Sequence, residues 1–287
     1  MLKPVVGALF AAVLLLASPA SARQLSPVDD WQLTENVEDC RLARAFGEGE
    51  ERTMLQIQSY GPQTPYQIVA RGSVFPIRDS RAILLDVGFG GDDAQEVIGV
   101  LGKSAERPLL RFALAPPRPT HIFARFYSYR ATSAKLAAEL QPSAEELVLG
   151  MTDMEPVAFA LGPMSEHFAR LDECVAGLAA KRGEVPGDQV AQPPRLIEGE
   201  ELAWRIKYPE NLLLNRISGM VYFRSTVGAD GRARECTVQA PNWGSRFEKD
   251  TCRALERWAR FEPARDDQAA PVASPFASAV FFIIYNW

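Results

Sequence analysis

Residues 219–240, GMVYFRSTVGADGRARECTVQA, decide the fold of the C-terminal part of the chain. Val221, Phe223 and Val227 are separated by even numbers of residues, so they share one face of a strand. Gly231 follows an Ala-Asp pair and accepts the positive φ that a tight hairpin turn requires. The stretch therefore predicts a β-hairpin, with a first strand that ends at Val227 and a second strand that begins after Gly231.

A helix is predicted after this hairpin. Residues 245–248, SRFE, have the S-x-x-E form of a capping box, which satisfies two backbone donors at a helix start. Phe247, Thr251, Leu255 and Trp258 then recur at helical spacing. This pattern predicts an amphipathic helix with Trp258 on its buried face.

Two more elements complete this region. Residues 208–215 are typical of a short helix before the hairpin, and residues 280–285, VFFIIY, are apolar enough for a last strand covered on at least one face. The order helix, strand, strand, helix, strand predicts a small α+β domain over residues 201–287. Its sheet is expected to have three antiparallel strands.

Residues 23–182 are predicted to form a separate, acidic and β-rich domain that ends in a helix. A regular apolar stripe over residues 163–181 indicates that helix, and residues 132–140 indicate a shorter one. Short runs rich in aliphatic or aromatic residues predict the strands: 54–60, 66–70, 82–87, 109–114, 121–127 and 157–161. The fold class of the whole chain is therefore α+β.

Residues 183–200 are predicted to be a linker between the two domains. They are rich in proline, glycine and charge, with few large aliphatic side chains. Pro193 and Pro194 stiffen the segment locally.

The first 22 residues are predicted to be a signal peptide. Lys3 precedes an apolar run of about 13 residues, Val5–Ala17, and residues 20–22, ASA, fit a signal-peptidase site. The run is shorter than the roughly 20 residues that span a bilayer. We therefore expect cleavage before Arg23, a periplasmic protein and no integral membrane span. An uncleaved membrane anchor is the alternative.

Four cysteines, Cys40, Cys174, Cys236 and Cys252, are typical of disulfides in an exported protein. Three pairings are possible. The domain organisation favours Cys40–Cys174 and Cys236–Cys252, because each pair then lies within one domain. Zinc ligation is the weaker alternative, since the chain has no C-x-x-C motif and no histidine cluster.

The charge pattern argues against nucleic acid as a partner. The chain carries a formal net charge of −5. Neither domain has the dense basic face that binding to a phosphate backbone requires.

The loop at residues 88–91 and the acidic residues around it are candidates for a cofactor or metal site. Residues 88–91, GFGG, match neither G-x-G-x-x-G nor the Walker pattern. The acidic residues around this loop lack the spacing of a calcium-binding loop. These acidic residues are Asp86, Asp92, Asp93 and Glu96. We expect a solvated loop, with no cofactor and no metal.

The chain has two histidines, His121 and His167, and neither belongs to a catalytic motif such as G-x-S-x-G or H-E-x-x-H. We expect structural roles for both and no enzymatic activity. A periplasmic hydrolase within residues 23–180 is the alternative. It requires a cleft in which one of the histidines lies beside a serine, a cysteine or a carboxylate.

A series of short motifs in residues 201–287 resembles the TonB C-terminal domain in order and spacing. Cys236 and Cys252 resemble a disulfide-bearing subset of that family, whereas Ala270 replaces the family's usual glycine. The motifs are Tyr208-Pro209, Gly219 with Val221 and Phe223, Asp230-Gly231, Phe247-Glu248, the run from Trp258 to Ala264, and Pro271-Val272.

The resemblance implies a protein-binding function. Domains of this family bind a short extended segment of an outer-membrane receptor, which adds a strand to the edge of the sheet. We expect the last strand to be that edge, and Trp243 to be an interface residue because it lies in a loop. The residues of the expected edge are Val280, Phe281, Phe282, Ile283, Ile284 and Tyr285.

The resemblance also leaves an alternative open. TonB itself keeps a membrane anchor and a long proline-rich spacer, whereas this chain has a cleavable N-terminus and an acidic domain. We therefore expect a periplasmic binding module. A membrane-anchored energy transducer for outer-membrane transport is the alternative if residues 1–22 are retained.

Overall fold

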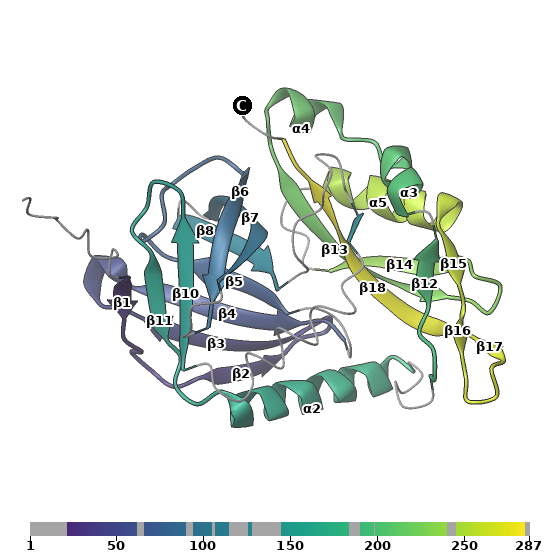
Figure 1. Ribbon diagram of the computed structural model, residues 1–287, viewed down its shortest axis with the longest axis horizontal. Coiled ribbons are helices and arrows are strands. Elements are labelled where there is room, and N and C mark those ends of the chain that lie inside the picture. Colours follow the sequence, from purple (N-terminus) through teal and green to yellow (C-terminus); the bar gives the residue numbers. More distant parts are fainter. Residues whose placement is uncertain are drawn as a thin grey trace, which may run out of the picture.

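The computed structural model describes residues 22–61, 66–89, 94–104, 107–114, 126–127, 145–183, 190–197, 199–239 and 245–284 (Figure 1). The predicted signal peptide, except Ala22, and the predicted helix at 132–140 lie outside these ranges. So do Asp92, Asp93, His121, Trp243 and Tyr285.

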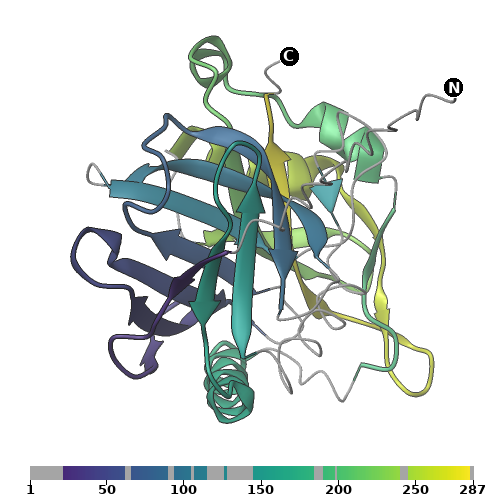
Figure 2. The ribbon, with the colours of Figure 1, turned by 60° about the vertical axis from the view of Figure 1, so that its left-hand side comes forward.

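One large, curled sheet dominates the N-terminal half (Figures 1 and 2). Its strand order is β1-β11-β10-β6-β7-β8-β5-β4-β3-β2, antiparallel except for the pair β1 and β11. A 3₁₀ turn, Gly49–Glu51, lies between β3 and β4. The strands are β1 (Arg23–Leu25), β2 (Gln32–Glu35), β3 (Cys40–Phe46), β4 (Thr53–Ser59), β5 (Gln67–Arg71), β6 (Arg81–Gly88), β7 (Gln95–Ser104), β8 (Arg107–Ala113), β10 (Glu146–Met151) and β11 (Val157–Ala160).

Helix α2 (Ser165–Lys181) packs against this sheet with the predicted apolar stripe. Phe168, Leu171, Val175 and Leu178 are all buried. The helix begins two residues later than expected, and Gly183 follows its end with a φ of 69°. A disulfide between Cys40 of β3 and Cys174 of α2 joins the sheet to the helix, as predicted.

The C-terminal half has a smaller antiparallel sheet in the order β14-β13-β18-β9. Its strands are β13 (Gly219–Val227), β14 (Ala233–Gln239), β18 (Ser274–Phe282) and β9 (Phe126–Tyr127). The predicted hairpin is present as β13 and β14. The last strand begins at Ser274 instead of Val280, because it pairs with β13 along its whole length. The fourth strand, β9, comes from the N-terminal half of the sequence.

Helix α5 (Ser245–Trp258) covers one face of this smaller sheet, and the predicted disulfide Cys236–Cys252 joins it to β14. Helix α4 (Glu210–Leu214) forms the short helix expected before the hairpin, and α3 (Gly199–Arg205) precedes it. Two small two-stranded antiparallel sheets complete the region: β12 (Arg195–Ile197) with β15 (Arg260–Glu262), and β16 (Ala264–Arg265) with β17 (Pro271–Val272). The architecture confirms the α+β class.

Both faces of the smaller sheet are buried. Phe223, Val280 and Phe282 pack into a core on the α5 side. Tyr222 and Phe281 point the other way, because successive side chains of a strand alternate between faces, and they pack with Tyr60 in a second core shared with the large sheet. The two sheets therefore contact each other through an apolar junction.

Candidate functional site

Within the predicted edge, the described residues 280–284 contribute mainly to the protein interior. Val280, Phe281 and Phe282 are at most 2% exposed. Ile283 and Ile284 are half-buried, and the backbone N–H of Ile284 donates to Ser218 Oγ at 3.1 Å. A partner strand at this edge would therefore meet the backbone of β18 and not the side chains of residues 280–282.

The chain itself supplies a neighbour for β18 on this side. Strand β9 pairs antiparallel with it, with Tyr127 opposite Ala279 and Phe126 opposite Val280. Within the residues that the structure describes, this pairing involves two of the nine residues of β18. The sequence predicts a strand at residues 121–127 but not its pairing with β18, because the paired residues lie about 150 positions apart in the chain.

The opposite edge of the sheet, strand β14, is a poorer template for an added strand. The register between β13 and β14 shifts near Arg224, and Glu235 has a positive φ of 55°. The backbone N–H of Cys236 donates to Glu256 Oε1 at 3.1 Å. Irregularities and occupied donors of this kind protect an edge against pairing. The geometry therefore favours the β18 side.

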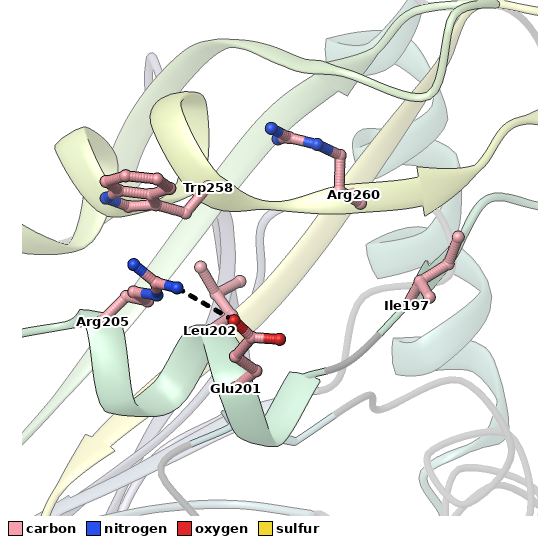
Figure 3. Close-up of a pocket in the computed structure, with 6 residues that line it drawn as sticks. All are labelled: Ile197, Glu201, Leu202, Arg205, Trp258 and Arg260. Atoms are coloured by element: carbon pink, nitrogen blue, oxygen red, sulfur yellow. Dashed lines mark hydrogen bonds and ion pairs between the residues drawn. The ribbon is translucent and has the colours of Figure 1, made fainter.

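A second surface feature lies where α3, the end of α5 and the β12–β15 pair meet (Figure 3). A pocket of about 200 Å³ is lined there by Ile197, Glu201, Leu202, Arg205, Trp258 and Arg260. We call it the Trp258 pocket. Arg205 lies beside the Trp258 ring, with its guanidinium carbon 4.7 Å from the ring centroid.

The prediction that Trp258 belongs to the core is wrong. Its side chain is 41% exposed. Phe247, Thr251 and Leu255 are buried as predicted, but the row continues at four-residue spacing to Ala259, which is 1% exposed. Trp258 is the last residue of α5, and its ring projects beside α3, where it contacts the guanidinium of Arg205.

Other large apolar side chains are exposed on α3 and α4. Trp204 is 67% exposed, Leu213 48% and Leu214 75%. Tryptophan and leucine at such exposure are available for contact with a partner.

The candidate catalytic and metal-binding residues do not form a site within the described part of the chain. His167 is half-buried near Trp31, with ring centroids 6.3 Å apart, and its Nδ1 has no hydrogen-bond partner. Burial lowers the pKa of this imidazole. Asp86 is exposed on β6, and the described residues contain no group of three or more His, Cys, Asp or Glu side chains placed to hold a metal ion.

The predicted linker is partly structured. Gln192 forms a bridge with Arg265, and β12 pairs with β15. Arg195 forms an ion pair with Glu262 across these strands and donates a hydrogen bond to its carboxylate. This hydrogen bond lowers the pKa of the Glu262 carboxyl. The segment after residue 190 is thus held against the smaller sheet's flank.

Comparisons with known proteins bear on the C-terminal half. No curated protein matches the chain. No helix in the described part of the chain is long and apolar enough to cross a membrane. Residues 205–283, which contain α4, α5 and the three main strands of the smaller sheet, match the family described as Gram-negative bacterial TonB protein C-terminal. This confirms the resemblance for that segment, which is similar to a TonB-like protein-interaction domain of the Gram-negative envelope.

Proposed function

We propose that this chain is a periplasmic protein-binding module that adds an extended segment of an envelope or outer-membrane protein to the outer edge of β18. The observation that carries the proposal is the pairing of β9 with β18 at Ala279 and Val280. This edge accepts an additional antiparallel strand, here from the same chain. An incoming segment would take the place of β9.

The surroundings of β18 suit this role. Its inner edge is paired with β13 from Ser274 to Phe282, and cores on both faces hold its side chains. The strand is therefore fixed before a partner arrives, which lowers the entropic cost of binding. A partner segment longer than two residues would form more ladder hydrogen bonds than β9 does.

The rest of the chain is assigned within the same proposal. Residues 1–22 are a cleaved signal peptide, residues 23–182 form an adaptor or sensor domain, and residues 183–200 connect it to the binding domain. The two disulfides support a periplasmic location, because disulfides persist in that oxidising compartment. The proposal includes no enzymatic step.

Capture followed by hydrogen exchange tests the proposal. Residues 23–287 are immobilised and incubated with a Gram-negative outer-membrane fraction, and the captured proteins are identified. Hydrogen exchange is then measured on the complex with each purified partner. We expect slower exchange in β18 than in the free protein. Protection confined to other elements, with β18 unchanged, would refute strand addition.

A further inference from the structure

The Trp258 pocket combines an exposed aromatic ring with two lining arginines, and a third arginine, Arg257, contacts the same ring; the pairing at β18 does not explain this composition. We propose that this pocket binds a carboxylate side chain in an acidic segment of a partner protein. The inference does not depend on strand addition, because the pocket is built from α3, α5, β12 and β15 (Figure 3).

The Trp258 ring orders two guanidinium groups. The guanidinium carbons of Arg205 and Arg257 lie 4.7 Å and 4.9 Å from its centroid, within the range of a cation–π contact. A guanidinium that stacks on a ring uses its flat face. Its N–H groups lie in the plane of the guanidinium, so they remain oriented for a carboxylate.

The described side chains that line the pocket or contact the Trp258 ring leave positive charge uncompensated. Arg205 pairs with Glu201 at 3.0 Å. Arg257 and Arg260 form no ion pair with a described carboxylate, although Nη1 of Arg260 donates to the backbone oxygen of Ala259 at 2.7 Å. Glu262, on the same strand as Arg260, is already bound by Arg195. Charge complementarity therefore favours an acidic occupant.

The size of the pocket favours a side chain over a free small molecule. Its volume of about 200 Å³ is below the roughly 300–1,000 Å³ of typical small-molecule sites. Ile197 and Leu202 supply apolar surface for the methylene groups of a glutamate, and the arginines supply donors for its carboxylate. Tryptophan and arginine are also the residue types that contribute most to binding at protein interfaces.

Titration of residues 23–287 with two blocked hexapeptides tests the proposal. One peptide alternates Glu and Asp, and the other alternates Gln and Asn. Isothermal titration calorimetry is expected to give at least tenfold tighter binding for the acidic peptide, with an affinity that falls as salt is raised because exposed charges are screened. The double substitution Arg257→Gln and Arg260→Gln is expected to raise the Kd of the acidic peptide at least tenfold.

The substitution Arg253→Gln is the matched control. Arg253 is also on α5, with a side chain 70% exposed, but it pairs with Asp250 and does not line the pocket. It should leave the Kd unchanged, and circular dichroism should show the same fold for all variants. Equal affinity for both peptides, an equal loss in the Arg253 variant, or displacement by inorganic phosphate at the same concentration as the peptide would each overturn the proposal. None of these results would affect strand addition at β18.

Discussion

Tyr60, which follows strand β4 of the large sheet, stacks on Tyr222 of β13, with ring centroids 5.8 Å apart. Both rings are buried, and burial raises the pKa of each phenol. Close by, Ser80 Oγ donates to the backbone oxygen of Ser218 at 2.5 Å, and the Ser218 N–H donates to the backbone oxygen of Ser80 at 3.0 Å. The two sheets thus share packed side chains and a reciprocal pair of hydrogen bonds.

This junction predicts a large cost for the substitution Phe281→Ala. Phe281 is 2% exposed and packs with Tyr60 and Tyr222, so its truncation leaves a cavity between the sheets. We expect a loss of about 3–5 kcal/mol in the free energy of unfolding, measured by urea denaturation. Leu214→Ala, at a residue 75% exposed, is the control and should change stability by less than about 0.5 kcal/mol. A loss below about 1 kcal/mol for Phe281→Ala would mean that the junction does not form.

Proline substitutions in β9 test whether it competes with a partner. In antiparallel pairing, one of two adjacent residues is in a hydrogen-bonded pair, so Phe126→Pro with Tyr127→Pro removes a ladder donor. We expect faster hydrogen exchange at whichever of Ala279 and Val280 donates its N–H to β9 and not to β13. The variant loses one hydrogen bond between β9 and β18, worth about 1 kcal/mol net. Because β9 then competes less strongly, an envelope partner should bind roughly fivefold more tightly.

The matched control replaces the same two residues with alanine, which keeps both backbone N–H groups. Exchange at the amide that faces β9 should be slower in this variant than in the proline variant. If both variants bind the partner equally well, loss of the β9 backbone donor has no effect on access to β18.

The two disulfides are expected to contribute unequally to stability. Cys40 and Cys174 are separated by 134 positions, whereas Cys236 and Cys252 are separated by 16. The chain-entropy account assigns about 5 kcal/mol to the longer loop and about 3 kcal/mol to the shorter one. Each cysteine pair is replaced by alanine, and the free energy of unfolding is measured by guanidinium denaturation. The loss should be larger without Cys40–Cys174 than without Cys236–Cys252. Reduced wild-type protein is the reference, and the reverse order would contradict the entropic account.

His167 predicts a loss of stability in mild acid. Burial lowers the pKa of its imidazole in the folded protein below the value of about 6.5 that it has in an unfolded chain. The unfolded chain then binds more protons than the folded one between the two pKa values, so stability falls as the pH drops below about 6.5. The urea midpoint should decrease less between pH 7.5 and pH 5.5 in His167→Gln than in the wild type. An identical decrease would assign the pH dependence to other groups.

Elements with strong local patterns could be predicted from the sequence. The hairpin around Gly231, the start of α5 at Ser245 and the stripe of α2 all have regular apolar spacing, and both disulfides follow from the domain organisation. Strand β7 was missed because Gly99 and Gly102 weaken its strand signal, although the large sheet pairs both residues with β8. Tertiary pairing overrode the local preference there.

The candidate site was harder to predict than the fold. The run 121–127 predicts a strand, but nothing local indicates that Phe126 and Tyr127 pair with β18, because that pairing depends on a distant partner. Trp258 was assigned to the core because its position fits helical spacing, but the small Ala259 fills the buried position instead. Helix α3, which brings Arg205 to the Trp258 ring, begins at a glycine and has no side-chain signal at its start.

The attachment of β9 to the same molecule as β18 affects which partners succeed. A tethered segment competes at an effective concentration that reaches the millimolar range, whatever the concentration of the protein. A free peptide at about 1 μM would need roughly a thousandfold better intrinsic affinity to occupy half of the molecules. Under the proposed strand addition, short or poorly matched segments would therefore not displace β9, and stable binding would require a long segment with a close fit.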